Sequence, residues 1–189
     1  SNASRGLGDV YKRQDMGPYY LTALVKALGP IQEVIGYSKK TFEKRNVENP
    51  EVNYKEINVD VDTHYFGLMK FKSEIIVDFQ VTFDVWKPYD PKLEVYGDES
   101  SLKLADPNNY DGDIFIFDKD LYQWELIYSS PDSQNNFYRG LGVVEMVKAI
   151  KNNTVSEDEL SVPFHILEVM CALDSYYLDS GWKKITQQF

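Results

Sequence analysis

The sequence has 189 residues, of which 43% are hydrophobic and 26% charged, so one globular domain with a sizeable core is expected. The formal charge of -10 repels phosphate groups, which argues against nucleic acid and anionic membrane surfaces as partners. The single cysteine, Cys171, excludes an internal disulfide and a cysteine-rich zinc site. Neither a signal peptide nor an apolar run of membrane-spanning length is visible, and we therefore expect a cytoplasmic protein.

Residues 1–14 show neither helical nor strand periodicity and are left out of the fold prediction. Ser1-Asn2-Ala3 is typical of the scar of a cleaved purification tag. Ser4 to Gln14, "SRGLGDVYKRQ", resembles translated adaptor sequence, and a disordered natural leader is the alternative. On the first interpretation the gene is truncated at its 5′ end, and residues 15–189 form a single domain.

The first predicted element is a helix from Asp15 to Leu28. Its apolar residues recur at i, i+3, i+4 and i+7 and form one face: Leu21, Leu24, Val25 and Leu28. Asp15 is expected to cap the helix, and Gly29-Pro30 to end it.

The middle of the sequence alternates with period two and predicts strands. Residues 57–71 and 75–85 are expected to form a long hairpin that turns at residues 72–74. The other predicted strands lie at 31–42, within a hairpin at 92–106, and at 113–118 and 124–130. Since most neighbours in sequence pair, we expect an open, mostly antiparallel sheet of about six or more strands.

Two more helices are predicted after the strands. The first covers residues 138–151, and its apolar side chains at helical spacing are Val143, Met146, Val147 and Ile150. Pro163 is expected at the start of the second, where Leu167, Met170, Cys171 and Leu173 follow, so that Cys171 is predicted in the core. The order helix, sheet, helix, helix predicts an α+β domain with its helices packed on one face of the sheet.

Two groups of residues are candidates for a metal site and a dinucleotide-binding site. Asp60, Asp62 and His64 alternate on one face of the predicted strand, but one histidine with two aspartates on an open sheet is more typical of a solvated or subunit-facing patch than of a metal site. Gly140-Leu141-Gly142 opens a helix without a preceding parallel strand, and Glu145 stands where a third glycine would be needed to bind a dinucleotide. His165 is expected to be structural.

Three segments in chain order carry a family pattern. They are "DMGPYYLTALVKALGP" at 15–30, "KLEVYGDESSLKL" at 92–104, and the helical stretches "NFYRGLGVVEMVKAIKNN" and "FHILEVMCALDS". Together they resemble the C-terminal domain of the Gfo/Idh/MocA oxidoreductases, whose fold is like the C-terminal domain of glyceraldehyde-3-phosphate dehydrogenase. In that family Glu74 and Ser100 fall at turn positions where glycine is common, so either each adopts a positive φ or, as we expect, the turn types adjust.

The resemblance implies roles for the first helix. Asp15 and Gly17 match the motif Asp-x-Gly-x-His-x-x-Asp, whereas Tyr19 replaces its histidine and Thr22 its second aspartate. Tyr19 would bind or deprotonate a substrate hydroxyl and Asp15 would orient it, as catalytic residues. Thr22, which cannot act as a carboxylate, would contact substrate. Apart from the resemblance, Tyr138 and Arg139 stand just before the helix that opens with Gly140 and are candidates to reach a substrate pocket; a surface role is the alternative.

Helical spacing, independently of the family, also places the three polar motif residues on one face of the first helix. Asp15, Tyr19 and Thr22 lie at i, i+4 and i+7 and therefore share one face. At about 100° per residue, that face lies nearly opposite the leucine face of the helix. The stripe is therefore expected to point away from the core.

The resemblance also implies a function. Family members bind NAD or NADP in an N-terminal Rossmann domain, which this sequence does not contain, and hold substrate and a second subunit with the C-terminal domain. We therefore expect the substrate-binding and oligomerisation domain of a truncated oxidoreductase for a sugar, cyclitol or related polyol. It would bind no cofactor or metal itself, be inactive alone, and form a homo-oligomer through its exposed sheet face. The alternative is an autonomous module for small-ligand binding or protein assembly.

Overall fold

A computed structural model describes residues 16–46, 56–85, 93–109, 111–130, 140–154, 158–174 and 181–189. The chain divides into two compact units, which are described separately. The first unit comprises residues 1–85 and 157–189, and the second comprises residues 86–156. None of the described helices is long and apolar enough to cross a membrane.

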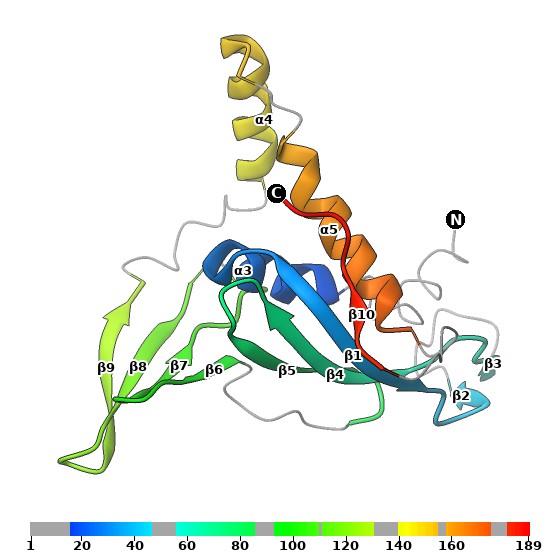
Figure 1. The fold of residues 1–189 in the computed structure, drawn as a ribbon, viewed down its shortest axis with the longest axis horizontal. Coiled ribbons are helices and arrows are strands. Elements are labelled where there is room, and N and C mark those ends of the chain that lie inside the picture. The colour runs from blue at the N-terminus through cyan, green and yellow to red at the C-terminus, as the bar shows by residue number, and fades with distance from the viewer. Residues whose placement is uncertain are drawn as a thin grey trace. The chain divides into compact units, whose positions relative to one another are not determined.

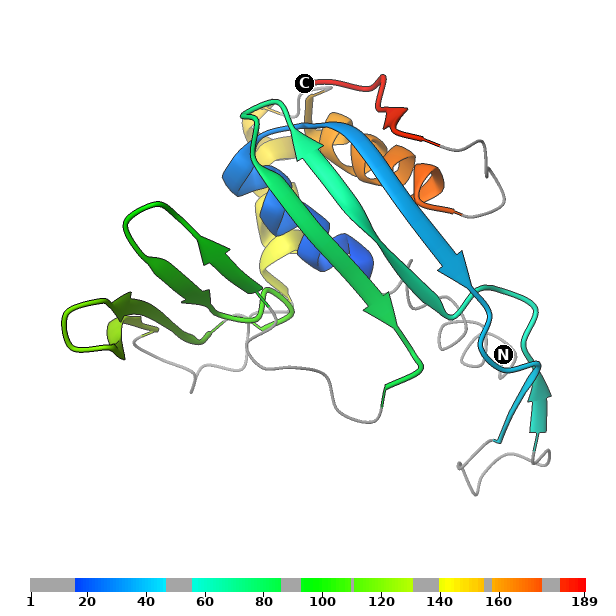
Figure 2. The ribbon, with the colours of Figure 1, turned by 60° about the horizontal axis from the view of Figure 1, so that its bottom comes forward.

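The first unit is built on an antiparallel sheet in the order β10-β1-β4-β5 (Figures 1 and 2). Its strands are β1 (Ile31–Lys39), β4 (His64–Phe71), β5 (Ile76–Thr82) and the short β10 (Lys183–Lys184). In the register, Gly36 of β1 lies opposite Gly67 of β4, which lies opposite Phe79 of β5. A small side hairpin, β2 (Lys44–Asn46) with β3 (Glu56–Asn58), leaves the sheet after β1.

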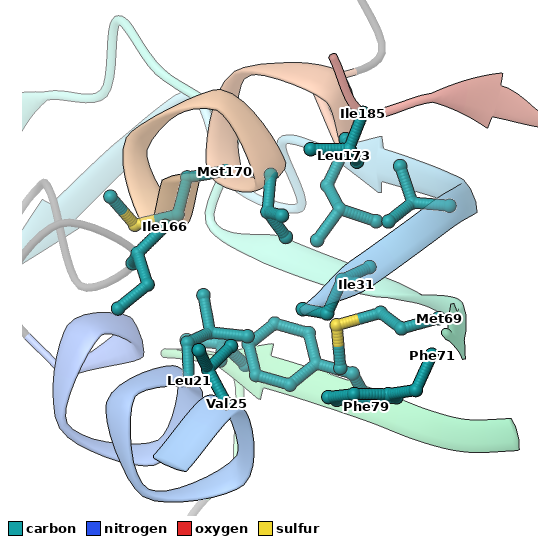
Figure 3. Packing of buried hydrophobic residues seen from close by; sticks show 13 residues of the cluster. Leu21, Val25, Ile31, Met69, Phe71, Phe79, Ile166, Met170, Leu173 and Ile185 are labelled. Atoms are coloured by element: carbon teal, nitrogen blue, oxygen red, sulfur yellow. The ribbon is translucent and has the colours of Figure 1, made fainter. Parts of the chain in front are cut away.

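Helices α3 (Gly17–Leu28) and α5 (Asp158–Ala172) cover one face of this sheet and enclose the core (Figure 3). The fully buried side chains with the largest volumes are Phe71, Leu21, Ile31, Met69, His165, Val25, Val34 and Val169. Leu21 and Val25 are buried, and Leu24 and Leu28 pack against the core, so the predicted leucine face is confirmed. Helix α3 ends at Gly29, whose φ of 87° suits glycine.

The glycine pair at the centre of the sheet lets α5 approach closely. A Cβ on Gly36 would lie 2.7 Å from a methyl carbon of Leu173, and one on Gly67 would lie 2.3 Å from the carbonyl oxygen of Ile35. The second contact is with backbone, which cannot rotate away. Side chains are therefore excluded from Gly67, and the end of α5 is seated directly on the sheet.

The second unit contains an antiparallel sheet in the order β6-β7-β8-β9 and the helix α4 (Leu141–Asn152). Its strands are β6 (Leu93–Tyr96), β7 (Ser101–Leu104), β8 (Asp113–Asp118) and β9 (Gln123–Ser129). The predicted hairpin at 92–106 and the two short strands are thus confirmed. So is the α+β class with antiparallel pairing, although the described strands form two four-stranded sheets and a side hairpin rather than one sheet.

Three details of the sequence prediction were wrong. The strand expected at 57–71 is interrupted, and β4 begins only at His64. Between its two parts, the backbone N–H groups of Val59 and Thr63 donate to the carbonyls of Glu43 and Lys39, outside a continuous strand ladder. Pro163 lies inside α5 rather than at its start, since the helix begins at Asp158. Cys171 is exposed rather than in the core, because it lies on the side of α5 away from buried Met170 and Leu173.

Two turn positions were candidates for a positive φ. Glu74 adopts a φ of 66° in the turn between β4 and β5. Ser100 is not among the described residues with positive φ, and its hydroxyl instead donates a 2.7 Å hydrogen bond to the carbonyl of Phe117. The first turn keeps the backbone that favours glycine, whereas the second has adapted to serine.

Candidate functional site

The candidate site begins on the first turn of α3. The structure describes two of the predicted residues, Tyr19 and Thr22, which lie one turn apart on this helix. The Tyr19 side chain is 50% exposed, whereas Thr22 is half-buried. Asp15, Tyr138 and Arg139 lie outside the described residues, so their proximity to Tyr19 stays a prediction.

The start of α3 is fixed by packing rather than by a polar cap. Met16 occupies the N-cap position without a side-chain cap hydrogen bond, and Pro18 stands in the first turn. Gly17 is buried, and a Cβ there would meet the sulfur of Met170 in α5 at 3.6 Å. With Leu21 in the core, this contact turns Tyr19 toward solvent, as the helical spacing predicted.

His165 holds the strand that follows α3. It is fully buried, and its Nε2 accepts a 3.0 Å hydrogen bond from the backbone N–H of Ile31. Its Nδ1–H donates to the carbonyl of Gln187 at 2.5 Å. Both ring nitrogens are thus occupied by backbone, and the predicted structural role is confirmed.

Glu168, one turn after His165 on α5, binds the C-terminal segment that follows β10. It accepts hydrogen bonds from the hydroxyl and N–H of Thr186 and from the N–H of Gln187, at 2.6–2.8 Å. Burial acts to raise the pKa of Glu168, but these hydrogen bonds lower it below its ordinary value. The Glu168 carboxylate thus holds Thr186 and Gln187 against α5.

A second polar cluster, which the sequence did not indicate, lies beside the side hairpin. Asp84 accepts hydrogen bonds from the hydroxyls of Thr41 at 2.5 Å and Thr63 at 2.8 Å, and forms an ion pair with Arg45. The Arg45 guanidinium also lies 5.8 Å from the ring centroids of Phe42 and Phe83. This Asp84 cluster anchors β2 to the end of β5.

The Asp84 cluster shifts the titration of its carboxylate. Partial burial acts to raise the pKa of Asp84, but the hydrogen bonds from Thr41 and Thr63 and the charge of Arg45 lower it below its ordinary value. The charged form is therefore favoured in the folded protein, and the cluster stabilises the fold rather than supplying an acid.

Asp60, Asp62 and His64 do not assemble as a metal-binding cluster. Within the described ranges, no three histidine, cysteine, aspartate or glutamate side chains come together in a way that could hold a metal ion. The His64 ring packs edge-on against Phe66 with centroids 5.8 Å apart, while Asp62 accepts a hydrogen bond from Ser38. His64 thus lies in β4, whereas Asp62 precedes that strand and bonds to the buried Ser38.

The outer face of the first sheet, opposite α3 and α5, is unusually apolar. Register places Tyr37 beside Phe66 and Ile35 beside Leu68, with Gln80 and Asp78 next to them on β5. Tyr37, Phe66 and Leu68 are 44%, 48% and 40% exposed. Together with His64 they line an open hollow of about 660 Å³. We call this surface the outer sheet face.

Several solved structures that resemble this chain are oxidoreductases. They include levoglucosan dehydrogenase in its apo form (TM-score 0.67, 13% identity, covering 93% of this chain and 51% of that one). An oxidoreductase domain protein from Kribbella flavida follows (TM-score 0.64, 19% identity, 93% and 51%). A putative NADPH-dependent oxidoreductase from Desulfitobacterium hafniense is similar (TM-score 0.64, 16% identity, 93% and 48%).

At these identities the likeness establishes the fold. The chain spans about half the length of each of these structures. A comparison with curated protein sequences gives no match. Residues 14–103, which include α3 and the strands through most of β7, match the family model described as "GFO/IDH/MocA C-terminal domain". The resemblance found in the sequence is thus confirmed over residues 14–103, which match this family model.

Proposed function

We propose that this chain is the substrate-binding and oligomerisation domain of an NAD(P)-dependent oxidoreductase that acts on a sugar, cyclitol or related polyol. The observation that carries the proposal is the half-exposed Tyr19 on the first turn of α3, within the segment that matches the family. The names of two similar structures, levoglucosan dehydrogenase with NADH and levoglucosan or L-sorbose, support a sugar-like substrate.

The chemistry of Tyr19 suits a substrate hydroxyl. A phenol can both donate and accept a hydrogen bond, so it can hold a substrate alcohol, and its phenolate form can accept the alcohol proton. Its ordinary pKa is about 10, so action as a base at neutral pH needs a nearby positive charge. Thr22, three residues further on the same helix, adds a second hydroxyl that can orient the substrate.

The cofactor belongs outside this chain in the proposed arrangement. NAD or NADP would accept hydride from the carbon that bears the hydroxyl, leaving a carbonyl. The hydroxyl proton would pass to Tyr19, with Asp15 orienting the hydroxyl and Tyr138 and Arg139 contacting the rest of the substrate. Residues 15–189 would then act as one substrate domain that needs a cofactor domain for activity.

Calorimetric and NMR titrations of the chain test this function. We expect no saturable binding of NADH or NADPH, and weak binding of some polyols that perturbs resonances of α3. Tyr19→Phe should abolish that perturbation, whereas Tyr37→Phe, which removes a comparably exposed hydroxyl from β1, should not. Tight binding of either nicotinamide cofactor, or equal effects of the two variants, would contradict the proposal.

The outer sheet face is the proposed surface for homo-oligomer formation. Its four central apolar side chains, Ile35, Tyr37, Phe66 and Leu68, form one block in the register of β1 and β4. Burying such a block against a second copy removes apolar surface from water on both sides. Light scattering should show a dimer that Phe66→Asp dissociates; a monomer at high concentration would contradict this interface.

The outer sheet face also supports the second candidate, an autonomous module for ligand binding or assembly. Its hollow of about 660 Å³ falls in the size range of ligand sites, and Asp78, Gln80 and His64 supply polar groups. Polyol binding that perturbs β1 and β4 but leaves α3 unchanged would favour this module over the oxidoreductase domain.

A further inference from the structure

The backbone just after α3 is held by residues from a distant part of the chain. Ile31, the first residue of β1, is fully buried and is separated from α3 by Gly29-Pro30. Its N–H donates to His165 Nε2 at 3.0 Å, and its carbonyl accepts a hydrogen bond from the Gln188 side-chain amide at 3.2 Å. Both backbone groups of Ile31 are thus bonded by side chains that lie 134 and 157 residues later in the chain.

The two side chains that hold Ile31 are themselves fixed. His165 is fully buried, and its Nδ1–H donates to the carbonyl of Gln187. The Gln188 amide also donates to the carbonyl of Ile185 at 3.1 Å, and the N–H of Ile185 donates to β1 at 2.9 Å. Ile185 belongs to the core of the first unit. The bonds to Ile31 are therefore part of a network that joins α5, β1 and residues 183–189.

Helix α3 depends on such contacts for its position. Isolated helices of up to about 12–15 residues are marginal in water, and α3 has 12 residues and no side-chain cap at its start. The turn between β4 and β5 also bonds its end, where the exposed Ser73 hydroxyl donates to the carbonyl of Leu28 at 3.1 Å. The bond from Ile31 to His165 is buried, so water competes with it less. It is therefore the stronger restraint on the end of α3.

Tyr19 lies at the opposite end of α3 from Ile31. The 12 residues of α3 make a helix about 18 Å long, so a tilt of about 10° at its end would move its first turn by about 3 Å. Displacing a reacting group by about 1 Å can lower a rate about 100-fold. A small change at Ile31 is therefore enlarged at Tyr19.

We propose that His165 and Gln188 are positioning residues for the candidate site. Their bonds to Ile31 fix the end of α3 and thereby the place of the Tyr19 hydroxyl. This role rests on the proposed function, in which Tyr19 holds the substrate hydroxyl. Of the two bonds that His165 makes, the one to Ile31 controls α3, whereas the one to Gln187 holds residues 183–189.

Two substitutions separate the two bonds of His165. The side-chain carbonyl of glutamine reaches about as far as Nε2, so His165→Gln keeps an acceptor for Ile31 and loses the bond to Gln187. The amide of asparagine reaches only about as far as Nδ1, so His165→Asn keeps the bond to Gln187 and leaves the Ile31 N–H buried without an acceptor. Each variant loses one bond, so urea denaturation should give the two similar midpoints.

Amide exchange and titration with D-glucose and myo-inositol, both followed by NMR in the full chain, then compare the variants. We expect His165→Asn to speed exchange across α3 at least about tenfold, whereas His165→Gln stays near the wild-type rates. His165→Asn should also weaken the response of α3 to these polyols at least about threefold. Exchange in β5 (Ile76–Thr82) should be the same in both variants.

Equal effects of the two variants on α3, or a polyol response that follows the urea midpoints, would overturn the positioning role. A wild-type chain that binds neither polyol but shows the expected exchange would count against the proposed function and support the hold on α3. If circular dichroism shows that a histidine variant is misfolded, Gln188→Leu replaces it, and only this variant should disturb α3. Its matched control is Gln187→Leu, because Gln187 is bonded through its backbone.

Discussion

The two units use the same sequence pattern with different results. In the first, alternating residues of β1, β4 and β5 meet two helices, and Phe71, Met69 and Ile31 are fully excluded from water. In the second, residues of β6–β9 alternate equally well, yet none of the described ones is buried. Alternation thus tells which face of a sheet is apolar, whereas burial depends on which element lies over it.

The largest difference should come from truncating a central side chain of the first unit. Phe71→Ala removes a fully buried ring and should lower the free energy of unfolding by about 3–5 kcal/mol. Leu126→Ala, at a residue of β9 that is 54% exposed, should cost less than about 1 kcal/mol. Urea denaturation measures both, and similar losses would remove the contrast between the units.

The next largest effect on stability is expected from replacing a glycine of the first unit. Gly67→Ala places a Cβ against the carbonyl oxygen of Ile35 and should destabilise the first unit by about 1–3 kcal/mol. Gly142→Ala in α4 meets nothing within 4 Å and should stabilise its helix by up to about 1 kcal/mol. Opposite signs in thermal melts are expected; a tolerated Gly67→Ala would show that the sheet can relax there.

The Asp84 cluster predicts a pH dependence confined to the first unit. Because the folded-state pKa of Asp84 is lowered, its contribution to stability is complete above the unfolded value of about 3.9 and is lost as pH falls through the folded value. Asp84→Asn should therefore flatten the stability profile below about pH 4. Asp78→Asn, an exposed change in β5, which ends two residues before Asp84, is the control, and an unchanged profile in Asp84→Asn would refute the assignment.

The smallest effect on stability is expected at the candidate site. Tyr19→Phe removes only a hydroxyl from a half-exposed side chain and should change the free energy of unfolding by less than about 0.5 kcal/mol. Any loss of polyol binding in this variant would then reflect the hydroxyl itself. A large destabilisation would instead give Tyr19 a structural role.

The sequence could predict the elements whose pattern is local. The leucine face of α3 and the outward position of Tyr19 follow from helical spacing, and the hairpins follow from alternation. The Asp84 cluster could not be predicted, because Thr41 and Thr63 are 43 and 21 residues away from it and meet it only through the side hairpin. The exposed Cys171 was missed because α5 has apolar residues all round.

The site itself was predicted only through the family resemblance. Helical spacing placed Tyr19 and Thr22 on one side of α3, but nothing local in the sequence links them to Tyr138 and Arg139, more than a hundred residues later. Asp15, Tyr138 and Arg139 stay predictions, because they lie outside the described residues.

Hydrogen exchange compares the two units most directly. Because every buried hydrophobic residue among the described ones lies in the first unit, the amides of β8 (Asp113–Asp118) should exchange at least about tenfold faster than those of β4 (His64–Phe71), equal to about 1.4 kcal/mol of local opening. Equal exchange rates in β8 and β4 would contradict the account.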